Sequence, residues 1–342
     1  MASAERRSRL LGVKLRALIA AHLGRPVDAD PGPFPNGAAV IDDETAWVLV
    51  EGAAGSMLGP ALTWALGRGV GALHLVADTD TGLLARRAER FDVPINVWHA
   101  SDRSLLPAIA EPLAPPPPAP AEHLEFRALI ESGGAEFAVE HGVVTGEVRG
   151  LEVCRVVDQP TTGQLVEMID QEVSDREHTA GLQLEVGVGA ADREAFQLLH
   201  GDVPTVDALA EVVRTVVAHR SADAPQHPLN RLARERYLRW CAIEEPSSVG
   251  LDLLRPAQPP VPRRSLKDPT PCVAAGSDAE GRPVTVVFSS GVDLDVIPFA
   301  ADVAAMTDDD IVVALPSRDV LPATLRLVDR LITSVAIHPL DT

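Results

Sequence analysis

Two glutamates in the middle of the chain stand in similar short sequences, and their carboxylates are the first groups to consider for chemistry. Glu152 lies in Gly150-Leu-Glu-Val and Glu185 in Leu184-Glu-Val-Gly187, each within an apolar segment of strand length. Two carboxylates that converge on one face of a sheet can bind a divalent metal such as Mg²⁺ and activate water for hydrolysis. Isolated strand carboxylates more often face solvent, so two exposed glutamates are the alternative interpretation.

The segments around these glutamates predict an alternation of helix and strand. Hydrophobic periodicity and glycine stops predict helices over 123–131, 192–200 and 206–220, and strands over 136–144, 147–157 and 182–188. Over residues 123–220 this order resembles the core of the restriction-endonuclease-like, PD-(D/E)xK family. The resemblance implies a metal-dependent phosphodiester hydrolase in which Glu152 and Glu185 are both the catalytic residues and the metal ligands. Gly187 stands where the family has a lysine, which implies a degenerate site.

Two polar clusters follow the second glutamate. Asp192-Arg193-Glu194 and His200-Gly201-Asp202 could add metal ligands or an acid–base pair. The same residue types are ordinary signals for the start and the end of a helix, and this second interpretation is the more common one. The sequence contains no HExxH motif and no paired His/Cys spacing, so a zinc site is not expected.

A glycine-containing turn near the N-terminus is a candidate phosphate site. Gly52, Gly55 and Ser56 lie between a predicted strand and a predicted helix, where backbone amides and the helix N-terminus can hold an anion. Asp78 and Asp80 follow the next predicted strand, at a position where a carboxylate can bind a ribose. The spacing matches neither GxGxxG nor a Walker motif, so a tight turn with two helix-capping residues is the alternative.

The main local concentration of basic residues lies in a helix predicted over 229–243. Its arginines are Arg231, Arg234, Arg236 and Arg239. They spread over more than half of the helix circumference. Arg231 and Arg234 could bind a phosphate, a nucleic acid or an acidic partner. Solvated arginines that pair weakly with surface carboxylates are the alternative.

Composition limits the possible functions. The net charge is −19, which does not favour nucleic acid as a partner. Lys14 and Lys267 are the only lysines, so P-loop, Schiff-base and ExK chemistry have no obvious donor. The three cysteines form no CxxC pair and no disulfide framework, and no apolar run is long enough to span a bilayer. These features predict a soluble cytoplasmic protein without a membrane segment.

The expected fold class is α/β, in three parts divided by two proline-rich linkers. Strands predicted over 46–50, 72–77 and 95–99, with helices between them, indicate a parallel-sheet α/β domain over 1–110. The linkers are 111–122 and 251–271. They enclose a mixed α+β middle domain over 123–250 and leave a small C-terminal α/β segment over 272–342. The chain as a whole resembles proteins common in actinobacteria, which implies no particular activity.

Two functional classes follow from these observations. The first is a non-catalytic binding or regulatory protein, which would bind a small phosphorylated ligand or a protein partner. The second is a metal-dependent, nuclease-like phosphodiester hydrolase that uses Glu152 and Glu185, with a divalent metal such as Mg²⁺ as its cofactor. The first is favoured because the sequence shows no complete catalytic set of residues.

Overall fold

The structure is a computed structural model that describes residues 2–158, 181–194, 205–221, 224, 227–263 and 269–341. Residues 159–180 and the cluster from His200 to Asp202 lie outside these residues. The chain forms two compact units. Unit 1 comprises Met1–Pro115, Pro246–Arg255 and Val273–Thr342, and unit 2 comprises Pro116–Glu245 and Pro256–Cys272. The predicted C-terminal segment therefore folds together with the N-terminal α/β domain.

The first half of unit 1 is built on a six-stranded sheet. Its strands, in sheet order, are β1 (Gly32–Phe34), β2 (Gly37–Asp42), β3 (Thr45–Val50), β4 (Ala72–Ala77), β5 (Ile95–Ser101) and β6 (Ser104–Pro107). The three central strands, β3 to β5, are parallel, and the strands at both edges are antiparallel to their neighbours. The predicted α/β class is confirmed, and antiparallel edge strands extend the predicted parallel core.

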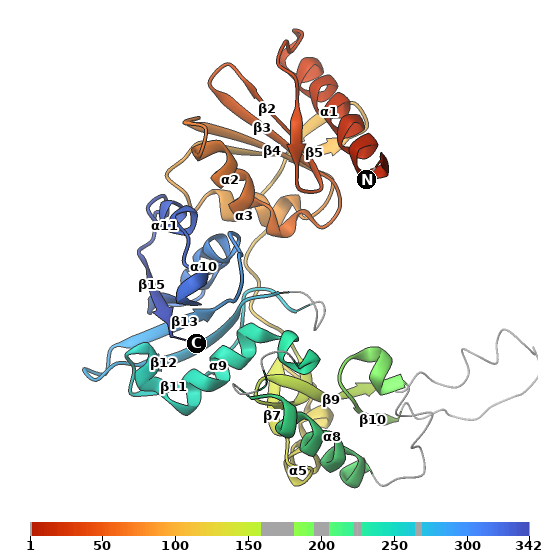
Figure 1. Cartoon of the computed structure of the whole chain (residues 1–342), viewed down its shortest axis with the longest axis vertical. Coiled ribbons are helices and arrows are strands. Elements are labelled where there is room, and N and C mark those ends of the chain that lie inside the picture. Colours follow the sequence, from red (N-terminus) through yellow and green to blue (C-terminus); the bar gives the residue numbers. More distant parts are fainter. Residues whose placement is uncertain are drawn as a thin grey trace, which may run out of the picture. The chain divides into compact units, whose positions relative to one another are not determined.

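Helices cover both faces of this sheet (Figure 1). Helix α1 (Ala2–Leu23) packs through Leu15, Leu18 and Ile19 against one face, which Trp47 and Leu49 of β3 share. Side chains alternate along a strand, so the remaining residues of β3 face α2 (Leu58–Leu66) and α3 (Thr81–Ala88). The short 3₁₀ helix η1 (Ala54–Ser56) precedes α2.

The second half of unit 1 repeats this arrangement. Its strands and helices are β11 (Leu253–Ala257), β12 (Cys272–Ser277), β13 (Pro283–Phe288), α10 (Val296–Ala304), β14 (Asp310–Pro316), α11 (Pro322–Val328) and β15 (Val335–Leu340), with 3₁₀ helices η3 (Pro246–Val249) and η4 (Ser317–Asp319). Strands β13, β14 and β15 are parallel. The starts of β3 and β13, of α2 and α10, and of β4 and β14 are separated by equal numbers of residues. Unit 1 thus contains two structural repeats, which were not recognised from the sequence.

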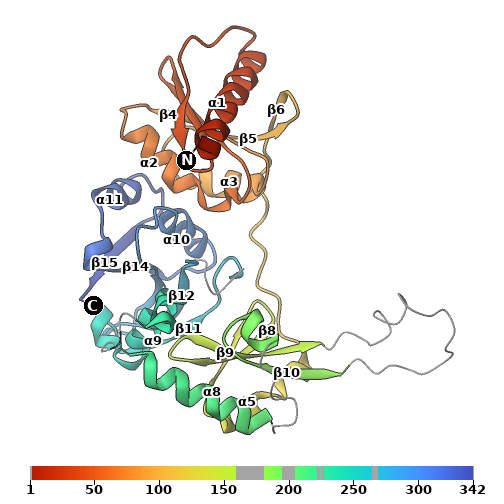
Figure 2. The same cartoon turned by 45° about the vertical axis from the view of Figure 1, so that its right-hand side comes forward.

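The two halves of unit 1 meet through their helices and one reciprocal backbone contact (Figure 2). The Asp92 amide donates to the Arg330 carbonyl, and the Ile332 amide donates to the Arg90 carbonyl, both at 2.9 Å. Helix α3 packs on α10, and α2 packs on α11. The equivalent residues of the two halves therefore make equivalent contacts, as in a symmetric dimer.

Buried ion pairs also join the two halves. Asp302 of α10 is fully buried and accepts hydrogen bonds from Arg86 Nε at 3.0 Å and from Arg87 Nε at 2.7 Å. Arg87 also donates to Asp295 at 2.7 Å. Burial disfavours the charged guanidinium of Arg87, but Asp295 and Asp302 outweigh this effect and raise its pKa.

Unit 2 contains a four-stranded antiparallel sheet with helices. Its elements are α4 (Ala121–Leu124), α5 (Arg127–Ser132), β7 (Glu136–Glu140), β8 (Val143–Val148), β9 (Leu151–Asp158), β10 (Leu182–Val186), α8 (Thr205–His219), the 3₁₀ helix η2 (Pro228–Arg231) and α9 (Arg234–Glu244). The sheet order is β10-β9-β8-β7, so β7 is an edge strand. Residues Ile130 of α5 and Leu209 of α8 contribute to the apolar core on one face of the sheet.

A β-bulge decides which side chains lie on the opposite face. Gly146 pairs with Cys154, but the next residue, Glu147, pairs with Glu152, so Val153 is skipped. A bulge of this kind re-aims the side chains that precede it. As a result Glu152 leaves the side of Cys154 and points to the same face as Arg155.

Among the residues that the structure describes, no helix is both long enough and apolar enough to cross a bilayer.

Candidate functional site

Three glutamates stand next to one another across the sheet of unit 2. Glu136 of β7 is paired with Glu147 of β8, and Glu147 is paired with Glu152 of β9. We call these three residues the glutamate row. Like charges directly opposite each other destabilise a sheet, so the row needs compensating cations.

Glu152 receives three arginines. Its Oε1 accepts from Arg155 Nε and Arg193 Nη1, each at 2.9 Å, and its Oε2 accepts from Arg155 Nη2 at 3.0 Å and Arg263 Nη2 at 2.9 Å. The Glu152 side chain is 1% exposed. The alternative that Glu152 is a solvent-facing residue is therefore wrong, because it lies at the centre of a buried ionic cluster.

Arg193 brings the two sequence-predicted site residues together. Besides Glu152, it donates through Nε to Glu185 Oε2 at 3.1 Å. Gly187 stands at the position where the resemblance implies a lysine. It has a φ of +138°, and its amide donates to the Val153 carbonyl at 2.8 Å. The cation at this position is thus supplied by Arg193, a residue of the cluster Asp192-Arg193-Glu194.

A divalent metal does not fit this arrangement. Mg²⁺ requires carboxylate or carbonyl oxygens that are free to coordinate it, whereas both oxygens of Glu152 already accept from guanidinium groups. A dication beside Glu152 would also meet three guanidinium charges at close range. No group of three or more His, Cys, Asp or Glu side chains in the described ranges is arranged to bind a metal ion.

Glu147, in the middle of the row, is neutralised from α9. Arg236 Nη1 donates to Glu147 Oε1 at 3.1 Å, and Arg239 Nη2 donates to Oε2 at 3.3 Å. Arg236 Nη2 also contacts both oxygens of Glu140 at 2.6 Å. Burial disfavours both charged forms, but the mutual attraction dominates, so the pKa of Glu147 is lowered and that of Arg236 is raised.

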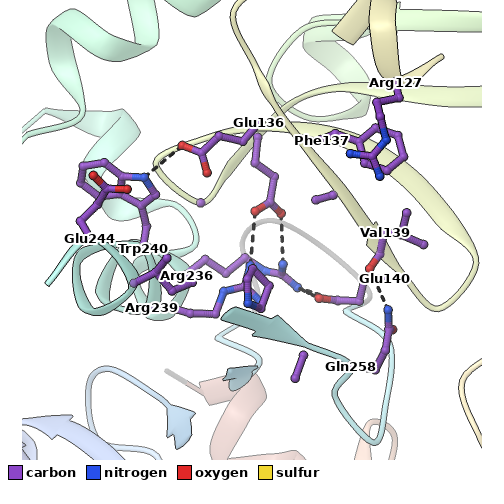
Figure 3. Close-up of a pocket in the computed structure, with 16 residues that line it drawn as sticks. Arg127, Glu136, Phe137, Val139, Glu140, Arg236, Arg239, Trp240, Glu244 and Gln258 are labelled. Carbon is purple, nitrogen blue, oxygen red and sulfur yellow. Dashed lines mark hydrogen bonds and ion pairs between the residues drawn. The ribbon is translucent and has the colours of Figure 1, made fainter. Parts of the chain in front are cut away.

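These ion pairs form the floor of a pocket beside the edge strand β7 (Figure 3). The pocket has a volume of about 440 Å³, within the usual range for small-molecule sites. Its side towards β11 is held by Gln258, whose Nε2 donates to the Val139 carbonyl at 2.8 Å and whose Oε1 accepts from the His141 amide at 3.0 Å. The pocket is therefore bounded by groups whose positions are fixed by hydrogen bonds.

Glu136, at the end of the row, lies at the rim of this pocket and has a different environment. It accepts from the indole Nε1 of Trp240 at 3.0 Å and from the backbone amide of Arg149. Figure 3 shows Glu244 next to the same indole. Partial burial and repulsion from Glu147 and Glu244 raise the pKa of Glu136. Among the described residues, no cationic side chain pairs with Glu136 or Glu244.

The glycine turn of unit 1 has internal acceptors for its amides. The Gly52 amide donates to Asp78 Oδ1 at 2.9 Å, and the Gly55 amide donates to Asp80 Oδ2 at 3.1 Å, while Ser56 is exposed. A phosphate approaching this turn would meet two carboxylates at the positions where it needs donors. The turn and the two aspartates, predicted as separate candidates, thus bind each other.

The segment predicted as one helix over 229–243 forms two elements, η2 and α9, and its arginines divide into two groups. Arg231 and Arg234, which the sequence analysis selected as ligand-binding residues, are exposed. Arg236 and Arg239 are buried at 3% and 5% exposure and hold the pocket floor. Their spacing of three residues places both on one face of the helix. Arg231 and Arg234 have the same spacing, so the local pattern does not distinguish the two pairs.

No family model, no curated protein and no solved structure matches this chain, so no activity is transferred to it by similarity.

Proposed function

We propose that the protein is a non-catalytic binding protein and that its binding site is the pocket of unit 2. The pocket combines a concave shape, a rigid ionic floor and a few polar groups at its rim, which is the usual composition of a ligand site. All three cysteines are unpaired, as expected in a reducing compartment such as the cytoplasm.

The state of Glu152 is the observation that carries the proposal. A hydrolytic centre needs a carboxylate with free lone pairs for a metal or for a reacting water. Glu152 instead uses both oxygens to hold three arginines in a buried cluster. In this geometry Glu152 fixes the positions of the side chains of Arg155, Arg193 and Arg263.

The competing proposal, metal-dependent phosphodiester hydrolysis, has one favourable feature. Arg193 contacts both Glu152 and Glu185, so a cationic group stands near the position where nuclease-like sites use a lysine. An arginine cannot be deprotonated at neutral pH, however, so it can stabilise charge but cannot act as a general base.

The two proposals are separated by measuring metal binding and cleavage with the full chain. Mn²⁺ and Mg²⁺ are titrated calorimetrically, and single- and double-stranded DNA and RNA are incubated with the protein and each metal. We expect no metal-dependent cleavage and no metal binding that depends on Glu185.

The variants Glu185→Gln and Glu125→Gln make this test specific. Glu185 is partly exposed, and Glu125 is an exposed residue of the same unit that serves as the charge-matched control. Cleavage by the wild type and by Glu125→Gln that is lost in Glu185→Gln would overturn the non-catalytic proposal.

A further inference from the structure

We propose that the pocket of unit 2 binds an organic cation, a guanidinium or ammonium group on an apolar stem, with Glu136 and Glu244 as its counter-charges. This inference rests on the proposed binding function and names the class of ligand.

The three glutamates of the row are neutralised unequally. Arg155, Arg193 and Arg263 neutralise Glu152, and Arg236 and Arg239 neutralise Glu147. The third member, Glu136, receives two neutral donors instead. Among the described residues, the row therefore lacks a paired cation only at Glu136, which lies at the rim of the pocket.

The lining of the whole pocket also contains more carboxylates than cationic side chains. Its described lining contains four glutamates and three arginines. Each arginine already pairs with a carboxylate, since Arg127 Nη1 donates to Glu131 at 3.2 Å and the other two hold Glu140 and Glu147. The carboxylates without a cation are those of Glu136 and Glu244.

An anionic ligand is disfavoured by the same geometry. To reach Arg236, a phosphate or carboxylate would have to displace Glu140, which contacts Arg236 Nη2 with both oxygens. It would then lie beside the carboxylates of Glu136 and Glu244, with which no described cationic side chain pairs. A cationic ligand is favoured instead, because its charge offsets the repulsion of Glu136 by Glu147 and Glu244, which contributes to the raised pKa of Glu136.

The remaining walls suit a short apolar stem. Ile243 and Pro256 line the pocket together with the ring of Phe137, one face of which is covered by the Arg127 guanidinium at 3.8 Å. The volume of about 440 Å³ exceeds what a single guanidinium needs. Trp240 fixes Glu136 through its indole N–H, so the carboxylate is oriented before the ligand binds. A pre-oriented carboxylate makes two parallel hydrogen bonds with a guanidinium without further ordering.

The test compares a charged probe with its neutral isostere. Butylguanidinium and butylurea are titrated into the full chain by calorimetry and by thermal shift. We expect binding of butylguanidinium and at least about tenfold weaker binding of butylurea, because a hydrogen bond between charged groups is lost. Equal binding of both compounds, or binding of neither, would overturn the proposal.

Variants locate the site. We expect Glu136→Gln to weaken butylguanidinium binding about tenfold and Glu244→Gln to weaken it less, because the indole of Trp240 orients the carboxylate of Glu136 before the ligand binds. Glu125→Gln, with the same change of charge outside the pocket, should bind like the wild type. Equal weakening in all three variants would show a general charge effect and would contradict a site at Glu136.

A capped Gly-Arg-Gly peptide distinguishes a free cation from an arginine side chain of a partner. Tighter binding of the peptide than of butylguanidinium assigns the site to a protein partner, and the reverse order assigns it to a small molecule. A failure of all cations, in a protein that also shows no metal-dependent cleavage, would remove this inference and leave the non-catalytic proposal in place.

Discussion

At the scale of residues, the molecule depends on arginines buried against carboxylates. Asp302 in unit 1 and Glu152 in unit 2 each hold more than one guanidinium. A buried ion pair adds little net stability when it forms, but removing one partner leaves an uncompensated buried charge. An arrangement of helices and strands that separates such a pair is therefore strongly disfavoured.

Asp293 of unit 1 gives a pH prediction. Burial and the nearby Asp295 raise its pKa to about 6, and its carboxylate accepts from Ser289 Oγ at 3.3 Å. The folded state therefore binds this proton more tightly than the unfolded state, whose aspartates titrate near about 3.9. The contribution of Asp293 to stability is full below pH 4 and is lost as the pH rises to about 6.

Asp293→Asn should therefore be more stable than the wild type at pH 7, by on the order of 1–2 kcal/mol, and about equal to it at pH 4. The measurement is denaturant unfolding at both pH values, followed by tryptophan fluorescence. Asp43→Asn, at a carboxylate with 83% exposure, is the control and should change little. A gain at pH 4 that disappears at pH 7 would contradict the assignment.

At the scale of elements, the contact between α2 and the loop before α10 leaves no space for a side chain. The Gly59 amide donates to Asp295 Oδ1 at 3.1 Å, and a Cβ at Gly59 would overlap the Leu294 carbonyl. Alanine normally stabilises a helix by about 1 kcal/mol relative to glycine. Here the overlap with rigid backbone reverses the sign.

We expect Gly59→Ala to destabilise unit 1 by roughly 2 kcal/mol, measured by denaturant unfolding. The matched control is Gly71→Ala, since a Cβ at Gly71 meets no atom within 4 Å. A stabilised Gly59→Ala variant would show that the two halves of unit 1 do not meet as described.

Much of the element order could be predicted from the sequence, because the central strands are short apolar runs. The predicted strand 72–77 has the bounds of β4, and the predicted helix 206–220 lies within one residue of α8. Strands β6 and β15 could not be predicted in this way, since each contains a proline and only sheet pairing supports it. The repeat in unit 1 was hidden because the residues of its two halves differ although their positions correspond.

The candidate site could be predicted only in part. Glu152 and Glu185 were selected as residues that converge, and Arg193 does connect them. The bulge at Val153 could not be foreseen, because strict alternation places Glu152 on the side of Cys154. The pairing of Arg236 with Glu147 joins residues 89 positions apart, which no local pattern indicates.

At the scale of the whole molecule, the acidic chain is organised as two compact units of different architecture. Unit 1 contains the same α/β arrangement twice, and buried ion pairs join its two halves. Unit 2 carries the glutamate row and the pocket. The account of function therefore depends on the role of Glu152, either as an anchor of arginines or as a metal ligand.

The most direct test is the stability of unit 2 in the full chain carrying Glu152→Gln, in buffer with a metal chelator. Hydrogen exchange of peptides from β8 and β9 gives the free energy of opening of this unit alone. We expect a loss of about 3–5 kcal/mol in Glu152→Gln, because the buried guanidiniums of Arg193 and Arg263 and the partly exposed one of Arg155 lose their carboxylate, and no loss in Glu125→Gln. Unchanged or increased stability of Glu152→Gln, together with stabilisation of the wild type by Mn²⁺, would contradict this expectation.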